Sequence, residues 1–167
     1  MDGKRNVIVT DTLGGLGTAV YEDYLAHAFC LGGMCRFQFN GKEFELREGD
    51  LMIIRKGKLM EKIRPSNDFL VKVIYVTSGF IELCTPQNNY GMKGQLFLFL
   101  NPVMHLTLEQ QEVCRRDFEL VELRLKNEDH HFYRDIMINV MQMTILDFFD
   151  FHSHLYGQEN ISTQNAS

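Results

Sequence analysis

Chemistry in this sequence would have to come mainly from its cysteines and histidines, the residue types that supply nucleophiles and metal ligands in other proteins. The chain contains four cysteines, none of them in a C-x-x-C pair, and their spacing does not match a disulfide framework. Two of the four lie within apolar runs, which favours buried free thiols in a reducing compartment. The cysteines are Cys30, Cys35, Cys84 and Cys114.

The histidines offer little catalytic potential. His152 and His154 form an H-x-H pair in a predicted helix, where residues two apart point in different directions. His130 and His131 lie at the start of the same helix and are expected to be exposed. No Ser/His/Asp or Cys/His arrangement is legible from the spacing. We therefore predict no catalytic residue and no cofactor, and we expect that the protein is not an enzyme.

The elements that would position these residues change in character near residue 106. Before it, short apolar runs alternate with turn residues, as in an all-β sandwich or barrel. Residues 37–46 show this best, because alternating apolar residues flank Asn40-Gly41, a pair suited to the two positive φ angles of a type I′ turn. Further strands are predicted at residues 51–54, 71–76 and 95–100.

After residue 106 the apolar period becomes helical. Thr107 and Gln110 have the spacing of a capping box, and a first helix follows with one apolar face. That face comprises Cys114, Phe118, Val121 and Leu125. A second helix is predicted at about residues 130–156, ending at Gly157, and the polar residues 158–167 are predicted to be a linker.

The second helix is apolar over more than one face. A helix that covers a single neighbour buries a stripe of about 100°, and the apolar residues here extend further round. This predicts burial on the chain's own core and on a second subunit. The expected dimer interface contains Ile136, Val140, Phe148 and Phe151. A deeply buried helix in a monomer is the alternative.

Charge and hydropathy narrow the class of protein. The formal net charge of −5 argues against a dedicated nucleic-acid surface. No run of 18 apolar residues suggests a membrane span, and residues 1–9 do not resemble a signal peptide. The expected location is the cytoplasm.

Two stretches carry a resemblance to a known family. Residues 40–51, Asn-Gly through the Gly-Asp turn to Leu51, resemble the hairpin and the entry into the next cupin strand of AraC-type transcription regulators. Residues 101–107 are similar to the segment that leads from the barrel to the first helix. The resemblance implies a mainly β chain with a cupin-like double-stranded β-barrel (jelly roll) followed by two antiparallel helices. The implied divisions are a barrel at 1–106, a dimerisation element at 107–157 and a linker stub at 158–167.

The same resemblance implies a function. In that family the barrel binds a small effector, the helices dimerise, and carboxy-terminal helix-turn-helix motifs bind DNA. We therefore expect a regulatory ligand-binding and dimerisation domain, a homodimer through its C-terminal helices, with DNA bound only through a part absent from this chain. A cupin-fold enzyme and a purely structural dimerisation module remain alternatives. A cyclic-nucleotide-binding regulator is disfavoured, because its phosphate cassette has no convincing counterpart here.

The resemblance also bears on metal binding. Enzymatic cupins hold a metal through two His and one Glu of a first motif and one His of a second. Aligned on the hairpin and the Gly-Asp turn, these positions hold His27, Phe29, Met34 and Met60, so one ligand of the four is kept and no metal site is predicted. Because these positions face the barrel interior in the family, the four side chains would line a ligand pocket. The alternative is a filled barrel in which His27 bonds to backbone.

Overall fold

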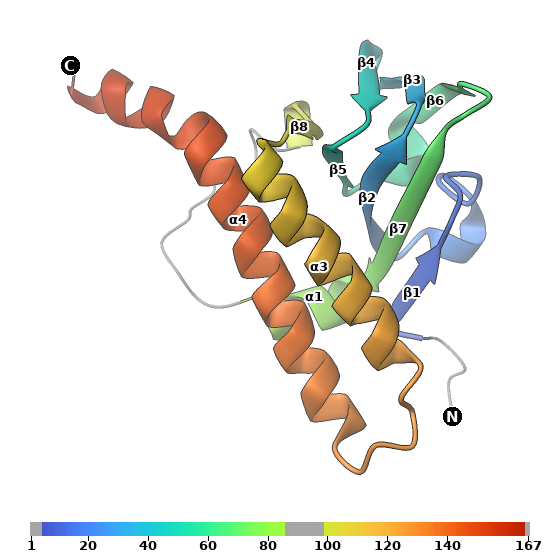
Figure 1. Cartoon of the computed structure of the whole chain (residues 1–167). Coiled ribbons are helices and arrows are strands. Elements are labelled where there is room, and N and C mark those ends of the chain that lie inside the picture. Colours follow the sequence, from blue (N-terminus) through green and yellow to red (C-terminus); the bar gives the residue numbers. More distant parts are fainter. Residues whose placement is uncertain (1–4, 86–98, 166–167) are drawn as a thin grey trace.

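The computed structural model describes residues 5–85 and 99–165, with side chains described as far as residue 155. Its strands and helices follow the expected order, strands first and a long helix pair last (Figure 1). The strands are β1 (Val7–Thr10), β2 (Tyr24–Gly32), β3 (Met34–Phe39), β4 (Lys42–Arg47), β5 (Asp50–Ile54), β6 (Met60–Pro65), β7 (Leu70–Thr77) and β8 (Val103–His105). The α-helices are α1 (Ser78–Cys84), α3 (Leu108–Leu125) and α4 (Tyr133–Asn165).

The strands form two antiparallel sheets. One has five strands in the order β1-β7-β2-β5-β8, and the other has three in the order β4-β3-β6. The prediction of an antiparallel β fold followed by helices is confirmed at this level. The described strands do not close into a continuous barrel, because no ladder joins the two sheets.

The β3–β4 hairpin forms as predicted. Asn40 and Gly41 both have positive φ angles, 52° and 80°, as a type I′ turn requires. Phe39 then pairs directly with Lys42 across the turn. The strands predicted at 51–54 and 71–76 are β5 and β7. The one predicted at 95–100 lies outside the described residues except for Phe99 and Leu100, which are helical.

The five-stranded sheet is buried on both faces, which explains why its central strands are almost continuously apolar. Side chains alternate between the faces of a strand. On β7, Val73 and Tyr75 belong to the core between the two sheets, whereas Ile74 and Val76 belong to a second core beneath the helices. The chain thus has an inter-sheet core and a sheet–helix core.

Helices α3 and α4 lie side by side against the five-stranded sheet (Figure 1). The Thr107 hydroxyl accepts from the Gln110 amide at 3.2 Å, and the Gln110 side chain accepts from the Thr107 amide at 2.8 Å, so the predicted capping box is confirmed. The predicted stop at Gly157 is wrong, since α4 continues to Asn165. The assignment of residues 158–167 to a linker stays a prediction. An interior glycine weakens a helix by about 1 kcal/mol without ending it, and no proline follows.

The wide apolar face of α4 has an intramolecular cause. The helix packs against α3, α1 and the sheet together, and three of the predicted interface residues are buried in the chain's own core: Val140, Phe148 and Phe151, at 8%, 3% and 2% exposure. Their assignment to a dimer interface is therefore wrong, because they have no surface left to offer a second subunit. Ile136 packs partly against the same core and stays half-exposed.

Among the described residues, no helix combines the length and the hydropathy that crossing a membrane would require.

Candidate ligand pocket

His27 does not face the space between the sheets. Its Nδ1 donates to the Ile74 carbonyl, 3.2 Å away, and its ring centroid lies 5.7 Å from that of Phe148 on α4. Burial lowers the pKa of His27 to about 4, so the ring is neutral at physiological pH. The alternative of a packed histidine bonded to backbone therefore describes this residue.

The other three predicted pocket residues do not converge on His27. Phe29 shares the helix-facing side of β2 and lies 5.7 Å from Phe118, between ring centroids. Met60 belongs to the inter-sheet core, and Met34 is half-buried beside the inward-pointing Cys35. The predicted common cavity is thus wrong. A shift of one residue in an alignment moves every side chain to the opposite face of its strand, and on β2 it is Ala26, Ala28 and Cys30 that face inward.

The inter-sheet space is filled by side chains. Tyr75 is 1% exposed, stacks on Tyr21 with ring centroids 3.9 Å apart, and has a buried hydroxyl without a hydrogen-bond partner among the described residues. Burial raises the pKa of Tyr75 to about 12. Other nearly inaccessible side chains in this core are Phe37, Phe39, Leu46, Met52 and Ile54. A ligand in this space would have to displace several of them.

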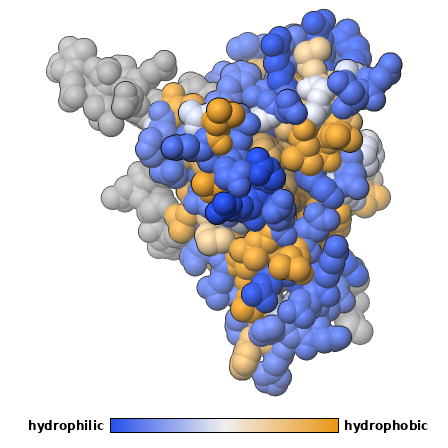
Figure 2. Space-filling view, viewed as in Figure 1, coloured by the Kyte–Doolittle hydropathy of each residue, from blue (hydrophilic) through white to orange (hydrophobic). Residues whose placement is uncertain are grey.

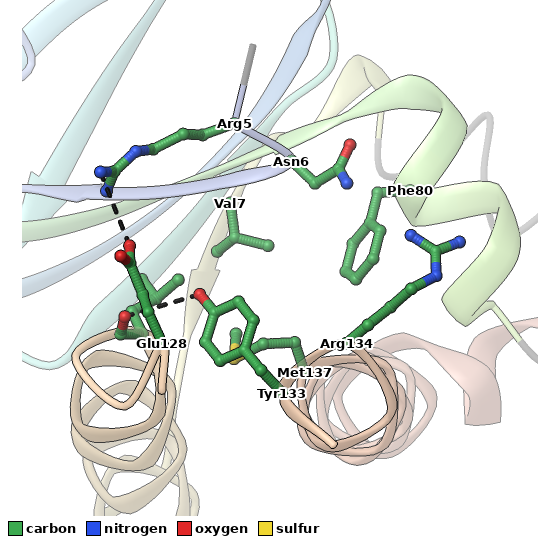
Figure 3. A pocket seen from close by; sticks show the side chains of 9 residues that line it. Arg5, Asn6, Val7, Phe80, Glu128, Tyr133, Arg134 and Met137 are labelled. Carbon is green, nitrogen blue, oxygen red and sulfur yellow. Dashed lines mark hydrogen bonds and ion pairs between the residues drawn. The ribbon is translucent and has the colours of Figure 1, made fainter. Parts of the chain in front are cut away.

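A cavity of about 270 Å³ lies instead where the five-stranded sheet meets the helices (Figure 3). Three segments far apart in the chain enclose it: the start of β1, helix α1, and the connection from α3 into α4. Its lining residues are Arg5, Asn6, Val7, Phe80, Leu125, Glu128, Tyr133, Arg134 and Met137.

A hydrogen-bonded chain positions one wall of this cavity. The Asn6 carbonyl accepts from the Thr77 amide at 2.9 Å, and the Thr77 hydroxyl donates to the Asn6 side-chain oxygen at 3.0 Å. The same hydroxyl accepts from the Phe80 amide at 3.4 Å and so caps α1. These bonds fix α1, and with it the Phe80 ring, relative to β1.

Polar side chains lie on two sides of the cavity. Arg5 approaches Glu128 at 3.6 Å, and the Tyr133 hydroxyl donates to the Leu125 carbonyl at 3.5 Å (Figure 3). Burial, and secondarily the Glu128 charge, raise the pKa of Tyr133, so its hydroxyl stays protonated. Arg134 has no hydrogen-bond or ion-pair partner in the part of the chain that the structure describes. Figure 3 draws its guanidinium on the side of the cavity where Phe80 lies.

This cavity was missed by sequence reasoning because no local pattern marks it. Its residues come from positions 5 to 137, and none of them forms a motif with its neighbours in the chain. Only the folded topology brings Arg5, Phe80 and Arg134 around one space. A local signal nearby is Thr77, which marks the start of α1 but does not reveal the cavity behind that helix.

A second unusual site lies between α3 and α4. Asp117 is 4% exposed, and its Oδ2 has no hydrogen-bond partner among the described residues. Burial first, then the hydrogen bond with Asp147 and its charge, raise the pKa of Asp117 to about 8. The neighbouring Cys114 thiol has its pKa raised well above the usual value by burial and by both carboxyl groups. Near neutral pH, Asp117 therefore holds its proton.

The described residues contain no cluster of metal-binding side chains. No group of three or more His, Cys, Asp or Glu side chains in the described residues could hold a metal ion. His105 contacts Asp50, Nδ1 to Oδ1 at 2.9 Å, as a pair only. The donor sets typical of transition-metal sites need several such groups converging.

Comparison with known proteins supports the fold. No protein-family model matches the sequence, and no curated protein sequence matches it. Among solved structures, the AraC-like transcriptional activator CuxR is similar with a TM-score of 0.50 and 12% identity, covering 90% of this chain and 57% of that one. The chain thus spans little more than half the length of that activator.

Two further structures have TM-scores below 0.5, too low to establish a shared fold. ToxT from Vibrio cholerae, in its unsaturated fatty acid-bound form, has a TM-score of 0.40 and 8% identity over 81% of this chain and 48% of its own. Oxalate decarboxylase from Bacillus subtilis has a TM-score of 0.29 and 16% sequence identity, covering 47% of this chain and 22% of its own. The likeness to CuxR extends to the fold: over most of its length this chain folds like part of an AraC-like transcriptional activator, in line with the predicted resemblance.

Proposed function

We propose that this chain is the regulatory, non-enzymatic domain of an AraC-type transcription regulator, which binds a small effector and dimerises. The observation that carries the proposal is the fold shared with an AraC-like activator over 90% of this chain. The two sheets would then be a cupin-like jelly roll with a packed interior. In such a regulator, working in the cytoplasm, DNA would be bound by helix-turn-helix motifs and not by the sheets and helices described above.

The cavity at the sheet–helix junction is the proposed effector site. Its lining joins β1, α1 and the start of α4, so a bound molecule would contact both the sheet and the helix pair. A ligand shifts a conformational equilibrium only by binding two arrangements with different affinity. A site that spans two layers meets this condition whenever the layers move relative to one another.

The proposed dimer uses the outward stripe of α4 rather than its buried face. Met143 and Leu146 are 42% and 44% exposed, and Ile136 lies seven residues before Met143 on the same side of the helix. Hydrophobic residues gather in patches among hydrophilic ones on the face that α3 and α4 present (Figure 2). A second copy packing helix to helix would cover this stripe.

Light scattering after size exclusion tests the dimer. Wild type is expected at twice the chain mass, and Met143→Glu and Leu146→Glu are expected to shift it to the monomer. Leu70→Glu is the matched control, because Leu70 is 62% exposed at the start of β7, away from the helices. A monomeric wild type would refute the dimer.

A thermal-shift screen tests effector binding. Sugars, small organic acids and aromatic metabolites cover the main chemical classes of effector. A ligand present at 100 times its Kd stabilises the folded state by about 2.7 kcal/mol, which a melting curve detects readily. Failure of every class, with the dimer intact, would favour the purely structural dimerisation module instead.

A further inference from the structure

We propose that the cavity between β1, α1 and the start of α4 binds a small monoanion with an apolar body, of the carboxylate class, and that Arg134 binds its charge. This inference rests on the proposed effector-binding function and names the ligand chemistry of that site.

The charge of the lining supports a single anion. Three charged side chains line the cavity: Arg5, Glu128 and Arg134. Arg5 is already partnered by Glu128 at 3.6 Å, whereas Arg134 has no ion-pair partner among the described residues. One positive charge is left over. A guanidinium offers two parallel N–H donors that match the two oxygens of a carboxylate.

The positions of the two arginines indicate which one binds the ligand. They lie on opposite sides of the cavity, with Arg5 directed to Glu128 and Arg134 on the side where Phe80 lies (Figure 3). A carboxylate at Arg134 therefore leaves the Arg5–Glu128 pair in place. Arg5 would have to break that pair before it could bind an anion.

The rest of the lining indicates that the uncharged end of the ligand is apolar, and the cavity volume limits the ligand's size. Val7, Phe80 and Met137 form an apolar wall, each of them at most 5% exposed. A strongly hydrated ion such as inorganic phosphate gains nothing from such a wall, whereas an alkyl or aromatic group does. Liquid water occupies about 30 Å³ per molecule, so 270 Å³ accommodates roughly ten non-hydrogen atoms.

Phenylacetate is a suitable probe, with phenylacetamide as its neutral isostere. For a ligand of this size we expect a Kd of about 1 mM for phenylacetate and binding at least roughly tenfold weaker for the amide. Binding is followed by thermal shift and by the methyl NMR signal of Met137, which reports on the cavity directly. Raising the salt concentration should weaken phenylacetate binding, because the Arg134 side is open to solvent.

Arg134→Gln tests the assigned contact, and Lys126→Gln is its matched control. Both variants remove one positive charge at an exposed position, but Lys126 is outside the lining. Arg134→Gln should weaken phenylacetate binding roughly tenfold, with unchanged thermal unfolding of the free protein, and Lys126→Gln should bind like wild type.

Each alternative outcome identifies what fails. Equal binding of acid and amide, equal effects of the two variants, or no shift of the Met137 signal by phenylacetate up to about ten times its expected Kd would overturn the inference. If a neutral compound shifts that signal at a lower concentration than phenylacetate does, the effector site stands and only the ligand class is wrong. If no compound of any class shifts it, the effector-binding function fails as well.

Discussion

Replacing Asp117 with Asn should stabilise the protein at alkaline pH and do little at acidic pH. The side chain is buried between α3 and α4 against Asp147 and the Cys114 thiol, and the described residues place no cation against it. Asn has nearly the same shape and can donate a hydrogen bond to Asp147. It therefore removes the cost of ionising a buried acid and keeps the packing.

The sign and the size of the expected change in unfolding free energy follow from the pKa of Asp117, which is raised from 3.8 to about 8 in the folded state. Between these values the folded chain holds a proton that the unfolded chain has released, so stability falls as pH rises from about 4 to about 8, and is constant above that. Each pH unit costs about 1.4 kcal/mol, which sets an upper bound of about 6 kcal/mol for the whole range. Relaxation and water entry reduce such penalties, and we expect about 3 kcal/mol.

Urea unfolding at about pH 5 and about pH 8.5 measures this difference. Asp117→Asn should be more stable than wild type by about 3 kcal/mol at the higher pH, with a melting temperature raised by about 6–12 °C, and closer to wild type at the lower pH. Glu119→Gln, on the exposed side of the same helix, controls for net charge and should change stability by less than about 0.5 kcal/mol. A stabilisation that is equal at both pH values, or a variant less stable at the higher pH, would refute the reasoning.

Three further substitutions test the fold. Thr107→Ala should cost about 1 kcal/mol in denaturant unfolding, because it removes half of the capping box of α3; an unchanged midpoint would contradict the cap. Gly33→Ala should cost more than about 1 kcal/mol, since Gly33 has a φ of 68° and a Cβ there would lie 2.7 Å from the Asp68 carbonyl carbon; a neutral effect would show that the turn can relax. Phe148→Ala should cost about 3–5 kcal/mol in thermal or urea unfolding without dissociating a dimer, and a folded monomer would instead restore Phe148 to the interface.

Local signals in the sequence predicted local structure well. Asn40-Gly41 determines a hairpin through the φ angles that its two residues tolerate, and Thr107 with Gln110 determines a helix start through two hydrogen bonds. These features depend on residues within four positions of each other. The resemblance to AraC-type regulators added the correct order of sheets and helices.

The sequence-based predictions that failed depended on strand register and tertiary packing. The face to which His27 points is decided by strand register, where an error of one residue exchanges the two cores. The breadth of the apolar face on α4 was correct, but its cause is packing on α3, α1 and the sheet rather than on a second subunit. The cavity could not be predicted, because its walls come from three segments with no shared motif.

The two cores differ in a way that bears on the proposed regulation. Among the described residues the inter-sheet core is largely apolar, and the hydroxyls of Tyr24 and Tyr75 are polar groups in it. Buried His27, Asp117 and Thr144 belong instead to the sheet–helix layer, where ionisation or hydrogen bonding can change how well the helices pack. The cavity opens at the end of that same layer. Because apolar packing tolerates little rearrangement while polar contacts can be exchanged, we expect an effector signal to pass through the helix layer, with the two sheets acting as its fixed support.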